Sequence, residues 1–393
     1  MSTLLARSHI YEHIGSVELM SKITGVGFYR AVATHRTTWY FAEFFDENGF
    51  TTTVEITKGD ESNAVIKLTS AIIERLKGID LSNDTDLVKL LNLQVVDGRS
   101  VRAASLSAVR SAISQFDAIR SGVSLCEYLG GTWSQSIPLY GNINRGLFST
   151  DRTPADFAEA AESAVNNGFT TIKCAPFDEV FSTQNLDDQV NLMQNGLDRI
   201  REIRSRLGFS VGLLIDCHAR FSELSTYRLL VELEPFSIDW LEEPLEPSDD
   251  SETLSRIVAK SDIPIAGAES GYGAYYYSTL MKKGSLDIVM PDIKYCGGVT
   301  EASVIGNIAV ENGKDFSIHC PSGPISLQAS GHSSLSVYGS MFLEHAVDEV
   351  AWRKNIIEPS ENIHNGKLRL ENGLGIGCEL NHDLVEKVSM MCI

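Results

Sequence analysis

The sequence reads VGLLID over residues 211–216, IDWLEE over 238–243 and IPIAGAE over 263–269. Each run is apolar, has the length of a β-strand, and carries an acidic residue at or near its end: Asp216, Glu242 and Glu269. These residues are spaced 26 and 27 positions apart, which is about one strand plus one helix of a β/α repeat. Because residues that end successive strands of a parallel barrel converge on one face, the three carboxylates are expected to meet there.

The same rhythm extends over eight candidate strands, which are 137–143, 170–175, 211–216, 238–243, 263–269, 287–292, 315–320 and 341–346. Amphipathic segments that close with glycine separate them, as helices do. A doubly wound sheet would open on a glycine-rich turn, and no GxGxxG follows the first strand. The sequence therefore predicts an α/β fold, a (β/α)8-type TIM barrel over residues 133–355.

The residues that precede the barrel predict another kind of structure. Residues 37–57 have the composition of a β-hairpin around the turn DENG, and residues 62–77 and 101–121 have helical apolar spacing. Residues 1–132 are thus expected to form an α+β capping domain. The tail, residues 356–393, contains a hairpin-like stretch, KLRLENGLGIGCEL, which is expected to lie outside the barrel and return to the capping domain.

Composition excludes several classes of function. The net charge of −19 argues against nucleic acid and anionic membranes as partners, and no apolar run is long enough to span a bilayer. The N-terminal residues lack a signal-peptide pattern. The seven cysteines are irregularly spaced and form no CxxC, which favours a reducing cytoplasm.

Three carboxylates at one point repel each other unless a cation lies among them. Ligand sets made only of oxygen suit hard divalent ions, Mg²⁺ above the others. One Mg²⁺ per subunit, held by Asp216, Glu242 and Glu269, is therefore predicted.

The other strand ends carry further polar residues, namely Lys173, His218, Asp292 with Lys294, His319 and Glu344. This ordered set resembles the enolase superfamily, mandelate racemase subgroup. The resemblance covers nearly the whole chain and includes SQFDA (114–118), WLEEP (240–244), PDIKYCGGVTE (291–301) and the interval from Asp292 to His319.

The resemblance implies a cap built from both termini, assembly as a homo-oligomer, and Mg²⁺-assisted removal of the α-proton of a small carboxylate. It implies that His319, oriented by Asp292, is the base. It also implies that Glu344 contacts the substrate carboxylate and that Asp216, Glu242 and Glu269 hold the metal.

Two departures point to the reaction. Racemases and cycloisomerases of the superfamily carry Lys-x-Lys on the second strand, where this chain reads Lys173-Cys174-Ala175. The DCHARF stretch (216–221) is similar to that of sugar-acid dehydratases such as galactonate dehydratases, in which the histidine protonates the departing hydroxyl. With His319 as base and His218 as acid, the chain is predicted to be a hydro-lyase that converts an aldonate into a 2-keto-3-deoxy acid.

Alternatives stay open at this point. Lys173 either binds the carboxylate or acts as a second acid/base. The substrate is alternatively a hydroxylated amino acid such as hydroxyproline, which is dehydrated or epimerised, and a third hypothesis is a non-catalytic descendant.

Substrate contacts are expected from two places. The glycine-containing segment 20–30 is interpreted as a lid, with Tyr29 and Arg30 as candidate contacts. On the first strand, Tyr140, Asn142 and Asn144 alternate toward the barrel interior, and Arg145 is a candidate partner for a carboxylate.

Overall fold

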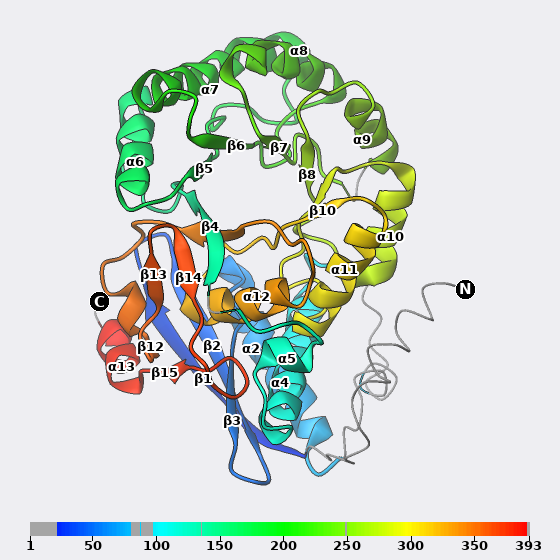
Figure 1. The fold of residues 1–393 in the computed structure, drawn as a ribbon, viewed down its shortest axis with the longest axis vertical. Coiled ribbons are helices and arrows are strands. Elements are labelled where there is room, and N and C mark those ends of the chain that lie inside the picture. Colours follow the sequence, from blue (N-terminus) through cyan, green and yellow to red (C-terminus); the bar gives the residue numbers. More distant parts are fainter. Residues whose placement is uncertain (1–21, 80–86, 88–96, 135, 248–249, 391–393) are drawn as a thin grey trace.

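The computed structural model describes residues 22–79, 87, 97–134, 136–247 and 250–390. Figure 1 shows a ring of strands surrounded by helices, and below it a second group of strands and helices drawn from both ends of the described chain.

All eight predicted barrel strands are present, although most are shorter than predicted. They are β4 (Ser136–Asn142), β5 (Thr171–Cys174), β6 (Gly212–Asp216), β7 (Trp240–Glu242), β8 (Ile265–Gly267), β9 (Ile288–Val289), β10 (Asp315–Phe316) and β11 (Leu343–Ala346). Parallel pairing runs in the order β10-β9-β8-β7-β6-β5-β4, and β11 pairs with β4. The ring closes where Met341 N–H donates to Phe316 O at 2.8 Å.

The helices between these strands form the outer layer in Figure 1. They are α6 (Pro154–Asn166), α7 (Leu186–Leu207), α8 (Glu223–Leu233), α9 (Ser251–Val258), α10 (Gly273–Lys283), α11 (Val299–Glu311) and α12 (Pro324–Leu335), with the short 3₁₀ helix η2 (Glu234–Phe236) after α8. Polar N-caps start several of them: the Thr153 hydroxyl accepts from Asp156 N–H at α6, and Ser222 accepts from Ser225 N–H at α8. Such caps satisfy amide groups that the first helical turn leaves free.

Inside the ring, apolar side chains fill the barrel below its mouth. The buried cluster consists of Tyr140, Leu214, Trp240, Ala266, Ile288 and Met290. The rings of Tyr140 and Trp240 meet edge to face, with centroids 5.3 Å apart. Because side chains alternate along a strand, the next inward-facing positions toward the carboxyl ends lie above this layer, at the mouth.

The cap combines a three-stranded sheet with helices. Its elements are β1 (Ile23–Val32), β2 (Thr38–Asp46), β3 (Thr51–Glu55), the 3₁₀ helix η1 (Gly59–Glu61), α2 (Ser62–Leu76), α4 (Val101–Arg120) and α5 (Leu125–Tyr128). The predicted hairpin is confirmed as β2 and β3, which pair antiparallel.

The interpretation of residues 20–30 as a lid was wrong for its described part. Residues 23–32 form strand β1, which pairs antiparallel with β2. Ile23, Val26 and Phe28 pack into the core of the cap, which holds this segment in the sheet despite its glycines. Residues 20 and 21 lie outside the described chain. The segment that reaches the barrel mouth is the turn between β1 and β2, residues 33–37.

The C-terminal segment contains η3 (Arg353–Asn355), β12 (Ile357–Glu358), β13 (Asn362–His364), β14 (Lys367–Arg369), β15 (Glu379–Leu380) and α13 (His382–Met390). The expected hairpin within 367–380 does not form, because β14 pairs with β13 while β15 pairs with β12. Moreover, β14 pairs antiparallel with the barrel strand β4, so this part of the tail extends the barrel sheet. Helix α13 then returns to the cap, where the His382 ring lies 4.8 Å from that of Tyr29 on β1.

No helix within the described ranges is both long and apolar enough to cross a membrane.

His332 links three segments inside the lower part of the molecule. Its Nδ1 accepts from Cys126 N–H at 3.2 Å, and its Nε2 lies 3.3 Å from Ile376 O. These contacts suit a neutral ring that donates from Nε2. Burial lowers the pKa of His332 to about 4.

A pH-dependent loss of stability follows from this histidine. Below its ordinary pKa the unfolded chain binds a proton that the folded chain excludes, so stability falls as the pH drops from about 6.5 toward 4. At pH 5 the loss relative to pH 7 is about 2 kcal/mol from this group. Urea denaturation of wild type and His332→Gln at both pH values measures it: the variant is expected to lose less stability on acidification. An equal loss in wild type, His332→Gln and the exposed control His364→Gln would contradict this assignment.

Candidate active site

A pocket of about 580 Å³ opens at the carboxyl ends of the barrel strands, under the turn between β1 and β2. Predicted site residues that line it are Asn142, Arg145, Asp216, His218, Glu269, Asp292 and His319. The cap adds residues of the 33–37 turn, Trp39 of β2 and Glu55 of β3. The pocket is therefore built by both parts of the chain.

Asp216 and Glu242 end β6 and β7 and are direct partners in the parallel ladder, so their side chains project the same way. Lys173 of β5 is fully buried beside them. Its Nζ lies 2.8 Å from Glu242 Oε1, 2.7 Å from Glu344 Oε1 and 3.6 Å from Asp216 Oδ2. The ammonium group thus sits among three carboxylates, and Lys173 does not appear in the pocket lining.

Lys173 and the three carboxylates around it lie at the base of the pocket, and we call this group the floor. Burial and the close charges shift the pKa values of its members strongly. Burial raises the pKa of Glu242 to about 8, because Lys173 offsets it only in part and Asp216 and Glu344 add like charge. Burial alone would lower the pKa of Lys173, but Glu242 and Glu344 raise it well above its usual value. Lys173 therefore stays a cation, and the floor has an excess of negative charge.

Glu269 lies two residues beyond the end of β8 and is positioned by a residue that the sequence reasoning missed. The Glu243 carboxylate accepts from Ala268 N–H at 2.9 Å and from Glu269 N–H at 3.2 Å. Glu243 and Ala268 both have positive φ, 38° and 77°. A Cβ at Gly267 would lie 2.7 Å from Glu243 Cγ, so glycine is needed there. Strained backbone of this kind clusters at functional sites.

His319 lies between two carboxylates. Its Nδ1 is 3.1 Å from Asp292 Oδ2 and its Nε2 is 2.8 Å from Glu269 Oε2. Burial works against a charged ring, but Glu269, Glu344 and Asp292 raise the pKa of His319 well above its usual value. The predicted pair of His319 and Asp292 is thus brought together.

Lys294 and Glu55 support this pair, although the sequence analysis gave Lys294 no role of its own and did not select Glu55. Lys294 Nζ lies 3.4 Å from Asp292 Oδ2 and contacts the Ser322 hydroxyl. Glu55, from the cap, accepts from Gly323 N–H at 3.0 Å and from Ser326 N–H at 3.4 Å. The loop that follows His319 is therefore held by a cap residue. No sequence motif marked Glu55, because its partners lie in the other part of the chain.

His218 follows β6 on the opposite side of the pocket from His319. Its Nε2 lies 3.1 Å from Asp216 Oδ2, and its side chain is half exposed to the pocket. Its φ of 50° turns the chain sharply after the strand. Asp216 raises the pKa of His218 to about 9, so the ring carries a proton at neutral pH.

Glu344 is buried at the floor rather than exposed in the lining. Its Oε1 accepts from Asn142 Nδ2 at 2.7 Å, and its Oε2 accepts from Cys320 N–H at 2.8 Å. Asn144 lines the pocket and accepts from Ala175 N–H at 2.8 Å.

Two predicted substrate contacts lie elsewhere. Tyr140 faces inward as predicted, but it belongs to the apolar layer inside the barrel, below the Lys173 ammonium, and is fully buried. The alternation of side chains along a strand predicts which face a residue lies on, but it does not predict how deep in the barrel that residue lies. For this reason the sequence placed Tyr140 at the mouth. Tyr29 lies on β1 against His382 and does not line the pocket.

Comparison with known proteins agrees with this geometry. A family model described as "Enolase C-terminal domain-like" matches residues 156–384, which is more than half of the chain. The chain belongs to the enolase superfamily.

Relatives of this superfamily member include two named sugar-acid dehydratases. A D-galactonate dehydratase from Ralstonia pickettii is 26% identical over 330 residues, covering 84% of this chain and 80% of the relative. A D-xylonate dehydratase from Haloferax volcanii is 25% identical over 334 residues, covering 81% and 79%.

Solved structures show the same fold. A member of the enolase superfamily from Salmonella Typhimurium has a TM-score of 0.83 at 24% identity, covering 93% of this chain and 98% of that chain. An enolase of the mandelate racemase subgroup from Agrobacterium tumefaciens has a TM-score of 0.79 at 23% identity, covering 93% and 96%.

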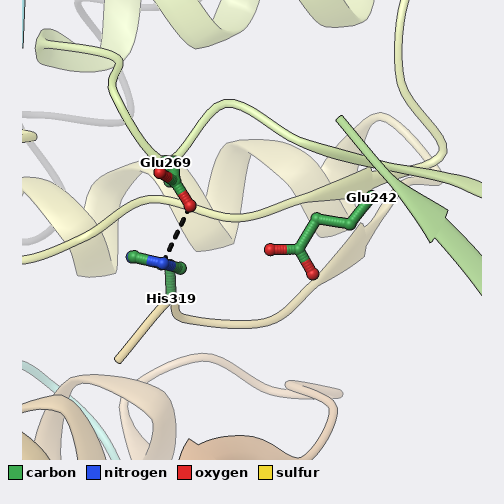
Figure 2. A group of neighbouring side chains, drawn as sticks. All are labelled: Glu242, Glu269 and His319. Carbon is green, nitrogen blue, oxygen red and sulfur yellow. Dashed lines mark ion pairs between the residues drawn. The ribbon is translucent and has the colours of Figure 1, made fainter. Parts of the chain in front are cut away.

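Members of this superfamily generally bind Mg²⁺, and the donor set here fits such an ion. Glu242, Glu269 and His319 each offer one ligand atom, all within 4.8 Å of one another, so two of the three predicted ligands are in this group and the third, Asp216, is not. Figure 2 shows the Glu242 carboxylate directed toward the paired Glu269 and His319. Five carboxylates gather at the floor and the dyad; they are Asp216, Glu242, Glu269, Asp292 and Glu344. An oxygen-rich group of this kind is the environment that a hard divalent cation prefers.

Removing the Lys173 charge tests the electrostatic account of the floor. Lys173→Met leaves three buried carboxylates without their shared cation, and breaking a buried ion pair on one side costs about 3–5 kcal/mol. Urea denaturation in EDTA is expected to show a loss of this size, with part of it recovered in Mg²⁺. The control Lys282→Met, on the exposed face of α10, is expected to change stability by less than about 0.5 kcal/mol. A Lys173→Met protein as stable as this control would refute the account.

Proposed function

We propose that this protein is a Mg²⁺-dependent hydro-lyase that dehydrates a sugar acid. One observation carries the proposal: two histidines face the same pocket from opposite sides of the barrel. His319 follows β10 and His218 follows β6, four strands away in an eight-strand ring. Elimination of water across a carbon–carbon bond needs one base and one acid, and this pair supplies them.

The base is His319. Asp292 accepts from its Nδ1 side and orients the ring, so that Nε2 faces the floor and the pocket. Lys294 keeps Asp292 ionised, and Glu55 fixes the loop behind the ring. His319 takes the α-proton of the acid at Nε2.

The acid is His218. Asp216 holds a proton on it at neutral pH, and the ring is half exposed in the pocket. His218 donates this proton to the β-hydroxyl as it leaves, which releases water. The enol that remains tautomerises to a 2-keto-3-deoxy acid.

Asp216, Glu242 and Glu269, at the ends of neighbouring strands, would hold the cation. When bound there, Mg²⁺ would neutralise Glu269 beside His319 and stabilise the negative charge that develops on the substrate carboxylate. Glu344, tied by Asn142 and Cys320, is buried next to Lys173 and supports the floor from outside the pocket lining.

The names of the relatives favour an aldonate as substrate, since one is a D-galactonate dehydratase and the other a D-xylonate dehydratase. Asn144 and the polar residues of the cap turn are the groups available to its hydroxyls. The epimerase alternative has less support. Ala175 lines the pocket where that reaction requires a second lysine, and Lys173 is buried in ion pairs beneath it.

Isotope exchange separates the roles of the two histidines. In D₂O with Mg²⁺ and galactonate or xylonate, His319→Asn is expected to lose both α-deuterium incorporation and 2-keto acid formation, roughly 10²–10⁴-fold. His218→Asn is expected to keep α-exchange and to lose elimination by a similar factor. NMR and a 2-keto-acid assay read the two steps. If His218→Asn eliminates water at the wild-type rate, another group is the acid and the proposed mechanism is wrong.

Calorimetric titration with Mg²⁺ separates ligands from the base. Asp216→Asn and Glu269→Gln are expected to weaken Mg²⁺ binding at least about tenfold, because each removes a charged ligand. His319→Asn is expected to bind Mg²⁺ within a few-fold of wild type. If His319→Asn instead loses Mg²⁺ as completely as Glu269→Gln, then His319 is a ligand and cannot be the base.

A further inference from the structure

Three arginines line the active-site pocket on the side that follows β4. Arg36 lies in the cap turn between β1 and β2, and Arg145 and Arg152 lie between β4 and α6. None of them takes part in the proposed proton transfers.

Arg36 and Arg145 are held in place by neutral groups, and Arg152 is held by neutral groups and by the carboxylate of Asp178. Arg36 Nη2 donates to Leu147 O at 2.6 Å, and Arg145 Nη1 donates to Thr37 Oγ1 at 3.3 Å. The first bond is donated by the cap turn to the barrel loop and the second by the barrel loop to the cap turn, so the two segments are linked. Arg152 Nη2 donates to Ala175 O at 3.1 Å, and its guanidinium lies 4.9 Å from the centre of the Phe157 ring. The guanidinium groups are thus positioned before any ligand arrives.

Their charges are poorly matched by the protein. Within the described part of the chain, the carboxylate within 4.0 Å of any of the three is that of Asp178, 2.5 Å from Arg152 Nε. Burial lowers the pKa of Arg36, and repulsion by Arg152 and Arg145 lowers it further, while Glu349 and Asp178 oppose this shift only in part. Cations crowded in this way are stabilised by an anion, and a guanidinium suits carboxylate or phosphate.

The position of these residues relates them to one end of the substrate. The acidic floor and His319 receive the reacting carboxylate and the α-carbon, and His218 faces the β-hydroxyl from the β6 side. Arg152 contacts the Ala175 carbonyl at the end of β5, the strand next to β6, so the arginines lie on the same side of the pocket as His218.

We infer that the sugar acid carries a second anionic group at its far end, a carboxylate or a phosphate, and that Arg36, Arg145 and Arg152 bind it. This inference rests on the proposed function, because the floor must receive the first carboxylate. It narrows the substrate class from aldonates in general to their terminally oxidised or phosphorylated forms.

The test compares three acids of galactonate stereochemistry: galactonate, the diacid with a carboxylate at C6, and galactonate 6-phosphate. Initial rates of 2-keto acid formation with Mg²⁺ give kcat/KM for each, and calorimetry in the His319→Asn background gives Kd without turnover. One or both dianions are expected to have kcat/KM roughly 10- to 100-fold above galactonate, and the better one identifies the anion. Arg145→Gln and Arg152→Gln are expected to remove that preference, because they lower kcat/KM for the better dianion, through KM, by a larger factor than they lower kcat/KM for galactonate. Arg145→Lys is expected to be intermediate, and the exposed Arg201→Gln is the control.

Two failures are distinguishable. If galactonate is dehydrated as well as both dianions, and Arg145→Gln affects all three equally, the inference is wrong while the proposed function stands. If none of the acids yields a 2-keto acid but a dianion still binds in an Arg145-dependent way, the proposed reaction is wrong and the anion site remains. A dianion that binds no better than galactonate in the His319→Asn background also refutes the inference.

Discussion

The rest of the site depends on how the barrel accommodates carboxylates crowded at its mouth. Asp216, Glu242 and Glu344 are each at most 4% exposed, and burying ionised groups without partners is very costly. Neutral donors share the compensation with Lys173: Trp240 Nε1–H donates to Glu242 at 3.2 Å, while an amide side chain and a backbone N–H serve Glu344. What remains uncompensated at the floor is negative charge, which is the environment that a hard divalent cation prefers.

Much of this arrangement could be predicted from the sequence, because parallel barrel strands have a simple pattern. A strand covered on both faces must be apolar, so an acidic residue at its end is conspicuous, and the spacing of Asp216, Glu242 and Glu269 gave the β/α repeat. The same reasoning located all eight strands, and the resemblance to the enolase superfamily implied the pairing of His319 with Asp292. Strand lengths were overestimated because the chain leaves the ladder early. Glu269, Asp292 and His319 all lie beyond the last paired residue of their strands.

The errors have physical causes of a different kind. Periodicity assigned Tyr140 to the inner face but could not tell that it lies one layer below the mouth, among apolar rings. Glycines near residue 25 suggested a lid, whereas pairing with β2 and burial of Ile23 made a strand. Contacts between segments that are far apart in the sequence produce no local sequence pattern, so they could not be predicted. Glu55 and Gly323 are 268 residues apart, and β14 joins the barrel sheet although it follows every barrel strand in the sequence.

The hydrogen bonds of Glu55 have a consequence for how such a molecule can be altered. A buried cap carboxylate accepts hydrogen bonds from the amide groups of the loop that follows His319, so the cap supports the wall of the pocket as well as covering it. A barrel separated from its cap would leave those amides and Lys294 without this partner. A chimera that took its cap from one relative and its barrel from another would have to match this buried contact as well as the outer surfaces, or the loop that follows His319 would be displaced.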